Sequence, residues 1–71
     1  MQEKEVYDYL TAHGVKASVQ RVAVMQYLLQ QMGHPTVDEI YQALVDHIPT
    51  LSKTTVYNTL RLLMEHGVVR M

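Results

Sequence analysis

The sequence contains no cysteine, and its 71 residues include only two prolines and three glycines. Without cysteine, these residues offer no disulfide framework, no thiolate metal site and no cysteine nucleophile. No stretch approaches the roughly 20 consecutive apolar residues that a membrane-spanning helix requires. The charged opening segment, "MQEKEVYDY", also lacks the apolar core of a secretory signal peptide. We therefore expect a cytoplasmic protein with no membrane partner.

The motifs of common enzymes are missing as well. There is no glycine-rich phosphate-binding loop, and no pair of carboxylates is placed on a predicted pocket wall. The hydrophobic fraction of 48% is normal for a folded chain and argues against disorder. A length of 71 residues suits one domain near the lower size limit for a single hydrophobic core. The sequence thus predicts a small globular domain that is not an enzyme.

Positive charge is scarce and unevenly distributed. The formal net charge is −1, which by itself argues against a nucleic-acid partner. Two segments, residues 15–37 and 47–64, nevertheless contain no acidic residue, and each contains two cations. The four cations are Lys16, Arg21, Lys53 and Arg61. A basic face on a nearly neutral domain permits DNA binding but does not establish it.

Hydrophobic periodicity predicts two helices in the first half of the chain. Over Gln2–Ala12 the apolar side chains recur on one face, and Gly14 is positioned to end this helix. Over Ser18–Met32 they cover a wide arc, which indicates a central helix that is buried on most sides. The five methionines are interpreted as core residues rather than soft-metal ligands, because they lie at helical spacing among leucines.

Two further helices are predicted in the second half. Thr36 and Glu39 have the spacing of a capping box at the start of the third helix. Pro49 then interrupts the helical pattern, and Ser52 is placed as the N-cap of a fourth helix that extends to His66. The last four residues, "VVRM", are typical of a β-strand, and this strand has no partner in the sequence.

These patterns define a predicted hydrophobic core. It consists of Val22, Met25, Leu29, Ile40, Leu44, Val56, Leu60 and Leu63. We expect Val68–Arg70 to be poorly anchored, because a strand without its partner lacks the hydrogen bonds of a sheet.

The fourth helix has two different faces. One is an apolar stripe at helical spacing, formed by Val56, Leu60 and Leu63. The other carries polar and cationic groups, from Lys53, Thr54, Tyr57, Asn58 and Arg61. Such groups bind phosphates and base edges, although a merely solvated face has the same pattern. The order of helix, short connection, capped helix and strand is that of a winged helix-turn-helix, a mainly α fold, and it favours DNA binding.

Three segments together resemble the N-terminal domain of the ferric uptake regulator family, bacterial transcription factors that respond to metals or peroxide. They are "GVKASVQRVAVMQYL", "GHPTVDEIYQAL" and "LSKTTVYNTLRLLMEHGVV". The resemblance covers nearly the whole chain, from about Gln2 to Arg70. Asn58 after Tyr57 is more similar to the peroxide-sensing branch than to the iron-uptake branch, which often has arginine there.

The resemblance implies a homodimeric repressor of metal-homeostasis or peroxide-stress genes. In that family a metal-loaded C-terminal domain sets the spacing of two DNA-binding domains on an A·T-rich palindromic operator. The sequence stops at Met71, so we expect residues 1–71 to be the winged-helix domain without the dimerisation and metal-sensing domain. The alternative is a full protein that ends within a strand. Alone, this domain is expected to be monomeric and to hold no cofactor, whereas Fe, Mn or Zn is implied for the full-length protein.

The resemblance also implies roles for individual residues. Tyr57 matches a family tyrosine that contacts thymine in the major groove, and Lys16 matches a lysine that enters an A·T-rich minor groove. Asn58 and Arg61 share the face of Tyr57 and are expected to contact base edges or phosphates. The remaining candidates are expected to contact phosphates, and they are Arg21, Ser52, Lys53, Thr54 and Thr55.

His34 is the one residue with expected sensor chemistry. It matches a family histidine that donates a ligand to the regulatory metal, and imidazole suits Fe, Mn, Zn and Ni alike. One nitrogen ligand cannot hold a metal tightly, so His34 is a candidate ligand only together with the C-terminal domain.

A different class of function stays open beside DNA binding. Winged-helix domains also serve as modules that bind other proteins, and the slight negative charge suits such a role. Affinity for DNA that falls steeply with salt would distinguish the two functions.

Overall fold

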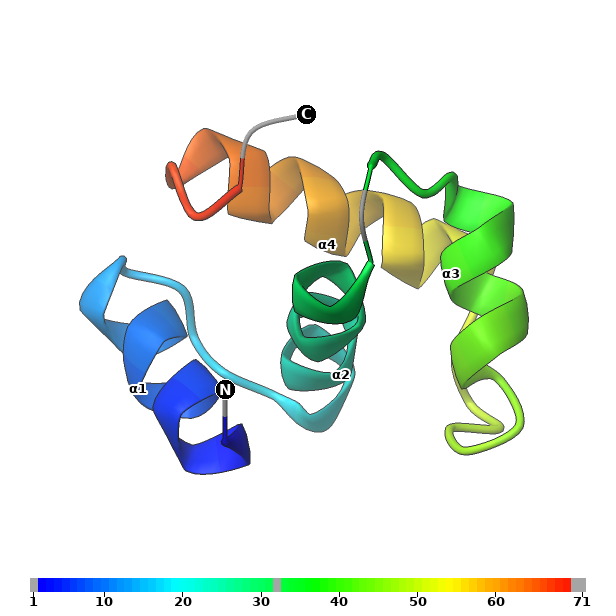
Figure 1. The fold of residues 1–71 in the computed structure, drawn as a ribbon, viewed down its shortest axis with the longest axis horizontal. Coiled ribbons are helices and arrows are strands. Elements are labelled where there is room, and N and C mark those ends of the chain that lie inside the picture. Colours follow the sequence, from blue (N-terminus) through cyan, green and yellow to red (C-terminus); the bar gives the residue numbers. More distant parts are fainter. Residues whose placement is uncertain (1, 32, 70–71) are drawn as a thin grey trace.

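The computed structural model describes residues 2–31 and 33–69, and within these ranges the chain forms four helices (Figure 1). They are α1 (Glu3–Ala12), α2 (Val19–Gln30), α3 (Val37–Leu44) and α4 (Lys53–Glu65). Helix α2 lies in the centre and contacts the other three, and α3 also packs against α4. The prediction of four helices around a central second helix is confirmed.

Three of the four helices begin at a hydroxyl side chain, as the sequence predicts. The side-chain oxygens of Ser18, Thr36 and Ser52 accept hydrogen bonds from the backbone N–H three residues later, at 3.2, 3.1 and 3.0 Å. Each bond satisfies an N–H group that the first turn of a helix leaves without a partner, and such a cap stabilises by about 1 kcal/mol. Thr36 also donates to the carboxylate of Glu39 at 3.3 Å, so the two side chains of the predicted capping box do meet.

Helices α1 and α4 end in the same way. Each is followed by the tripeptide His-Gly-Val, at residues 13–15 and 66–68. Both glycines have a positive φ, 78° and 71°, a conformation that other residues adopt only with strain. In both cases the valine N–H donates, over 2.9 Å, to the carbonyl oxygen five residues earlier. This is the Schellman motif, which ends a helix and directs the next apolar side chain back to the core.

The second of these motifs corrects the prediction for the end of the chain. Val68 is only 8% exposed and belongs to the core, so the expectation that it is poorly anchored is wrong. Its N–H is already used by the helix end, and neither Val68 nor Val69 is part of a strand. The rest of the predicted wing strand, residues 70–71, lies outside the described residues.

The core lies between the inner sides of all four helices. Six of the eight predicted core residues are buried, namely Val22, Met25, Ile40, Val56, Leu60 and Leu63. Leu44 packs at the edge of the core and is partly buried. The prediction is wrong at Leu29, which is 47% exposed, whereas Val24 is fully buried. Apolar residues surround α2 almost evenly, so their spacing does not show which of them face a neighbouring helix.

All four helices are short, with 8 to 13 residues each. Helix α2 ends at Gln30, because the extended backbone of Gln31 (φ −97°, ψ 140°) does not continue the helix. Its predicted end, Met32, lies outside the described residues. None of the described helices is long and apolar enough to cross a membrane.

Candidate nucleic-acid interface

Helix α4 presents one side to the core and the other to solvent. Its inner stripe is at most 6% exposed and consists of Val56, Thr59, Leu60 and Leu63. The five side chains of the predicted polar face are all exposed, namely Lys53, Thr54, Tyr57, Asn58 and Arg61. Because the buried stripe fixes the rotation of the helix, the polar face is held outward.

A groove of 520 Å³ runs between the start of α2 and one side of α4. Four of the predicted DNA-binding residues line it, namely Lys16, Arg21, Thr55 and Asn58. Ser18 and Gln20 line it as well, although no sequence signal other than the helix cap at Ser18 pointed to them. None of the lining residues is acidic, so the groove carries positive formal charge and suits an anion.

Tyr57 and Arg61 lie on the other side of α4. They line a more apolar hollow of 310 Å³, which also includes Pro35 and Met64. Tyr57 and Asn58 are neighbours in the sequence, yet they border different hollows. The outward ridge of α4 therefore offers hydrogen-bonding groups on both of its flanks.

Arg21 supports the backbone next to Lys16. Its Nη1 donates a hydrogen bond of 2.7 Å to the carbonyl oxygen of Lys16. The preceding residue, Val15, is 1% exposed, so the loop is fixed on both sides of Lys16 while the lysine side chain stays exposed. Arg21 thus has a positioning contact that its spacing in the sequence did not predict.

The first turn of α4 is organised by hydroxyl groups. The Oγ of Ser52 lies 3.0 Å from the backbone nitrogen of Thr55 and 2.9 Å from its Oγ1. Ser52 is therefore a helix cap whatever else it contacts. Thr54 is exposed in the same turn, and the positive end of the helix dipole is available to an anion there.

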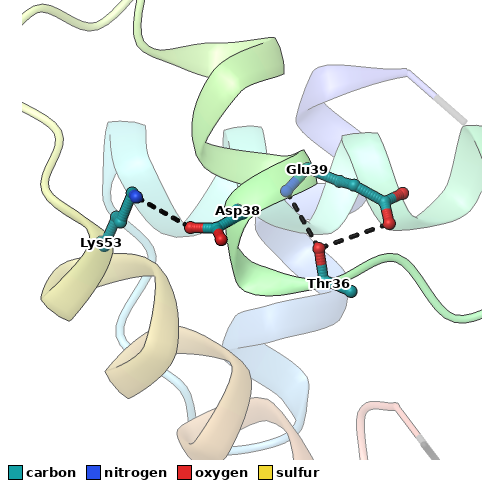
Figure 2. A network of polar contacts seen from close by, with 4 residues as sticks. All are labelled: Thr36, Asp38, Glu39 and Lys53. Atoms are coloured by element: carbon teal, nitrogen blue, oxygen red, sulfur yellow. Dashed lines mark hydrogen bonds and ion pairs between the residues drawn. The ribbon is translucent and has the colours of Figure 1, made fainter.

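Lys53 is paired with an acid from another helix. Its Nζ lies 2.9 Å from the Oδ1 of Asp38 in the first turn of α3 (Figure 2). It also lies 5.7 Å from the centre of the Tyr41 ring. The hydrogen bond and the negative charge of Asp38 raise the pKa of Lys53 above its ordinary value of 10.5. Both side chains are more than half exposed, so water weakens the attraction between them.

Arg61 is paired as well, with an acid on its own helix. Its Nε donates a hydrogen bond of 3.0 Å to the Oε1 of Glu65, one turn later. Both cations of α4 therefore lie beside carboxylates. In residues 2–31 and 33–69, neither Lys16 nor Arg21 forms an ion pair.

The segment of residues 47–64 contains no acidic residue, but in the folded domain its two cations lie beside acids from outside the segment. Glu65 was detectable beforehand, because a glutamate four residues after an arginine meets it on the surface of a helix. Asp38 was not, since only the packing of α3 against α4 brings it to Lys53. The sequence analysis named neither carboxylate as a partner of these cations, and only Asp38 lacked any local signal.

His34 lies apart from the groove beside α2. It is exposed and borders an apolar hollow of 220 Å³ that also includes Leu29, Val68 and Val69. Among the residues that the structure describes, no three side chains of the metal-binding types lie close enough together to hold an ion. Within this part of the chain His34 is therefore a single candidate ligand.

Two of the other histidines have structural contacts. The Nδ1 of His13 donates to the carbonyl oxygen of Tyr9 at 2.9 Å, within the last turn of α1. The Nδ1 of His66 donates over 3.0 Å to the carbonyl oxygen of His13. This second bond joins the end of α4 to the end of α1, two residues before the loop that carries Lys16 begins at Val15.

The four-helix core and the capped helix with a free polar face define a helix-turn-helix domain of the winged-helix class. Comparison with known proteins specifies the family. Residues 12–71 match the Ferric uptake regulator family, and the chain belongs to this family. Its relatives are transcription regulators rather than enzymes.

The most informative relatives are regulators of the peroxide response. The chain is 45% identical over 67 residues to the peroxide operon regulator of Bacillus subtilis (strain 168), which covers 94% of this chain and 46% of that protein. It is 47% identical over 57 residues to the peroxide-responsive repressor PerR of Staphylococcus epidermidis, which covers 80% of this chain and 38% of that one. These relatives agree with the predicted similarity to the peroxide-sensing branch.

A solved structure shows the same fold. The structure named "Structure of GAS PerR-Zn-Zn" aligns with a TM-score of 0.77 and 32% sequence identity, over 92% of this chain and 41% of that chain. The chain thus spans less than half the length of each of these three relatives.

Proposed function

We propose that this chain binds double-stranded DNA in a sequence-specific manner, as the DNA-binding domain of a metal-dependent transcriptional repressor. The observation that carries the proposal is the rotation of α4. Its buried stripe leaves an unbroken ridge of polar side chains in solvent, and a groove without acidic residues borders this ridge. A ridge of this kind on an α-helix fits the major groove, where base edges present distinct patterns of donors and acceptors.

The proposed roles follow from where each side chain lies. Tyr57 and Asn58, exposed on the two flanks of the ridge, read base edges, and the phenol ring packs against a thymine methyl group. Lys16 extends from its fixed loop into an A·T-rich minor groove, whose narrow form concentrates negative potential. The remaining side chains contact phosphates, and they are Arg21, Ser52, Lys53, Thr54, Thr55 and Arg61.

We further propose that residues 1–71 form the DNA-binding domain of a cytoplasmic homodimer that acts on an A·T-rich palindromic operator of peroxide-stress genes. The support is similarity to regulators named for a peroxide operon and a peroxide response, of which this chain covers less than half. His34 would donate one ligand to a regulatory metal, for which Fe, Mn and Zn all accept imidazole. The zinc in the name of the similar structure supports a metal of this kind.

Chemical-shift mapping by NMR tests the DNA-binding proposal directly. Titration with an A·T-rich duplex should shift the amides of α4, of the start of α2 and of the loop at Lys16. Affinity should fall linearly with salt on a logarithmic plot, with a slope of about −0.9 for each phosphate that is neutralised. Two copies of the domain joined by a linker should bind a palindrome more tightly than one copy binds a half-site.

The same experiment identifies the competing function. If DNA shifts the amides of α1 and spares α4, the docking face is wrong. If no duplex causes salt-dependent shifts, the domain is better described as a module that binds another protein.

A further inference from the structure

The ion pair between Lys53 and Asp38 joins two helices at the edge of the proposed interface. Lys53 is the first residue of α4, and Asp38 is the second residue of α3. Figure 2 shows the lysine extending from α4 to the carboxylate on α3, where the two atoms lie 2.9 Å apart. The pair is therefore a contact between the helix that enters the groove and the helix that packs behind it.

Stability does not explain this contact well. The two side chains are 57% and 72% exposed, and ion pairs exposed to this degree add little to the free energy of unfolding. The helices already pack through buried side chains such as Ile40 and Val56, which are fully buried. The pair instead determines where the ammonium of Lys53 lies when no other anion is present.

A DNA phosphate at the start of α4 requires the same ammonium. We propose that Asp38 is an intramolecular competitor for the phosphate that Lys53 contacts, so that Asp38 lowers the affinity of this domain for DNA. The proposal rests on the proposed DNA-binding function. An ammonium has three N–H donors and can approach two anions, but the carboxylate and the phosphate then repel each other across it. Lys53 contributes less than a free lysine as a result.

The neighbouring acid provides a matched control. Glu39 also lies in the first turn of α3, but its Oε1 is 3.3 Å from the Oγ1 of Thr36, and in Figure 2 it extends away from Lys53. Replacing either acid by its amide removes one negative charge from the same turn. Only the replacement of Asp38 releases Lys53, so a local competition and a general charge effect predict different results.

The test compares five proteins in DNA binding by fluorescence anisotropy at several salt concentrations. They are the wild type, Asp38→Asn, Glu39→Gln, Lys53→Met and the double variant Asp38→Asn/Lys53→Met. Asp38→Asn should bind an A·T-rich duplex and an unrelated duplex about two- to fivefold more tightly, the range expected for one exposed ion pair. Its salt dependence should steepen by up to about one unit, because Lys53 then releases a counterion more completely. Circular dichroism confirms that each variant folds.

The double variant decides between the two explanations. Competition predicts that Asp38→Asn has no effect once Lys53 is methionine, and that Glu39→Gln leaves the affinity within experimental error of the wild type. Equal gains from Asp38→Asn and Glu39→Gln, or a gain that persists without Lys53, would overturn the proposal in favour of net charge. Weaker binding by Asp38→Asn would overturn it too, since Asp38 would then hold Lys53 in place for the phosphate. Binding that Asp38→Asn leaves unchanged would also overturn the proposal, because Asp38 would then not compete for Lys53. If the wild type itself binds no duplex, it is the proposed DNA-binding function that fails.

Discussion

The two pairs of cations at the proposed interface are held in opposite ways. Lys16 and Arg21, beside the start of α2, form no ion pair in the described part of the chain, and Arg21 supports the backbone of Lys16. Lys53 and Arg61, on α4, each lie within 3.0 Å of a carboxylate oxygen. If the domain binds DNA as proposed, we expect the long-range attraction of phosphates to come mainly from Lys16 and Arg21.

This difference suggests that two parts of the proposed interface have different roles, one in the electrostatic attraction of DNA phosphates and one in the recognition of base edges. The cations of α4 are balanced by carboxylates, so we expect α4 to contribute to DNA binding mainly at short range, through groups such as Tyr57 and Asn58. A lysine at the start of a recognition helix is thus not automatically a strong phosphate contact, because the neighbouring helix can supply an acid. The lysine that we expect to attract phosphates most strongly is Lys16, which lies in the loop before α2 and not on α4.

The largest effect is expected on the free energy of unfolding, from a substitution that tests how α4 is rotated. The comparison of the two pairs of cations depends on this rotation. Leu60 is 6% exposed, and Leu60→Ala should lower the free energy of unfolding by about 2–5 kcal/mol, because it leaves a cavity in the core. Met64, 44% exposed on the same helix, provides the control, and Met64→Ala should change stability little. Urea unfolding followed by circular dichroism measures both. A loss below about 1 kcal/mol for Leu60→Ala would show that α4 is rotated and that its cations face elsewhere.

The next largest effect concerns the affinity for a specific DNA site and the recognition of base edges by α4. Tyr57→Ala should weaken binding to the specific A·T-rich site by about 1–3 kcal/mol, because a contact to a base edge is lost. Binding to unrelated DNA and the salt dependence should change little. Tyr7, similarly exposed on α1, is the control, and Tyr7→Ala should leave both kinds of binding unchanged. Equal losses on specific and unrelated duplexes would mean that Tyr57 does not read bases.

A smaller effect distinguishes the two cation pairs themselves. Lys16→Ala should weaken specific and non-specific binding alike and reduce the slope of the salt dependence by about one. Lys53→Ala should reduce it by clearly less, because Asp38 already balances that charge. Lys4→Ala, on α1, serves as the control for loss of a distant cation. If the two variants reduce the slope of the salt dependence equally, Lys16 and Lys53 attract phosphates equally, and the proposed difference between the two pairs of cations is wrong.

The smallest effect is a dependence of stability on pH. Asp38 raises the pKa of Lys53, so the folded state holds this proton more tightly than the unfolded state. The stabilisation by the pair is therefore fully present below pH 10.5 and is lost as the pH rises through the raised pKa. The difference in melting temperature between the wild type and Asp38→Asn should narrow over that range. A constant difference would indicate that Asp38 acts on the dipole of α3 instead.

Local signals in the sequence predicted most of the backbone. Hydroxyl caps at Ser18, Thr36 and Ser52 mark three helix starts, and the glycines at 14 and 67 mark two helix ends. These signals work because each bond they make lies within a few residues of the chain. The inner and outer faces of α4 followed from spacing for the same reason.

Partners that come from a distant part of the chain could not be predicted in this way. The two His-Gly-Val tripeptides have the same backbone, yet His13 bonds within its own helix whereas His66 bonds to another. The position of Asp38 beside Lys53 depends on how α3 packs, and the exposure of Leu29 depends on which sides of α2 are covered. Periodicity contains none of this information.

The hydrogen bond from His66 to His13 constrains how far apart two parts of the proposed interface lie, the loop at Lys16 and helix α4. It connects residues 53 positions apart in the chain, next to the loop of Lys16 on one side and at the end of α4 on the other. With His66 bonded to His13 and Arg21 bonded to the carbonyl oxygen of Lys16, we expect the protein to set the distance between the proposed minor-groove contact of Lys16 and the proposed major-groove contacts of α4. Moving the A·T-rich step by one base pair, about 3.4 Å, would have to be accommodated by bending of the DNA. Operators should accordingly vary in base composition at other positions before they vary in this spacing.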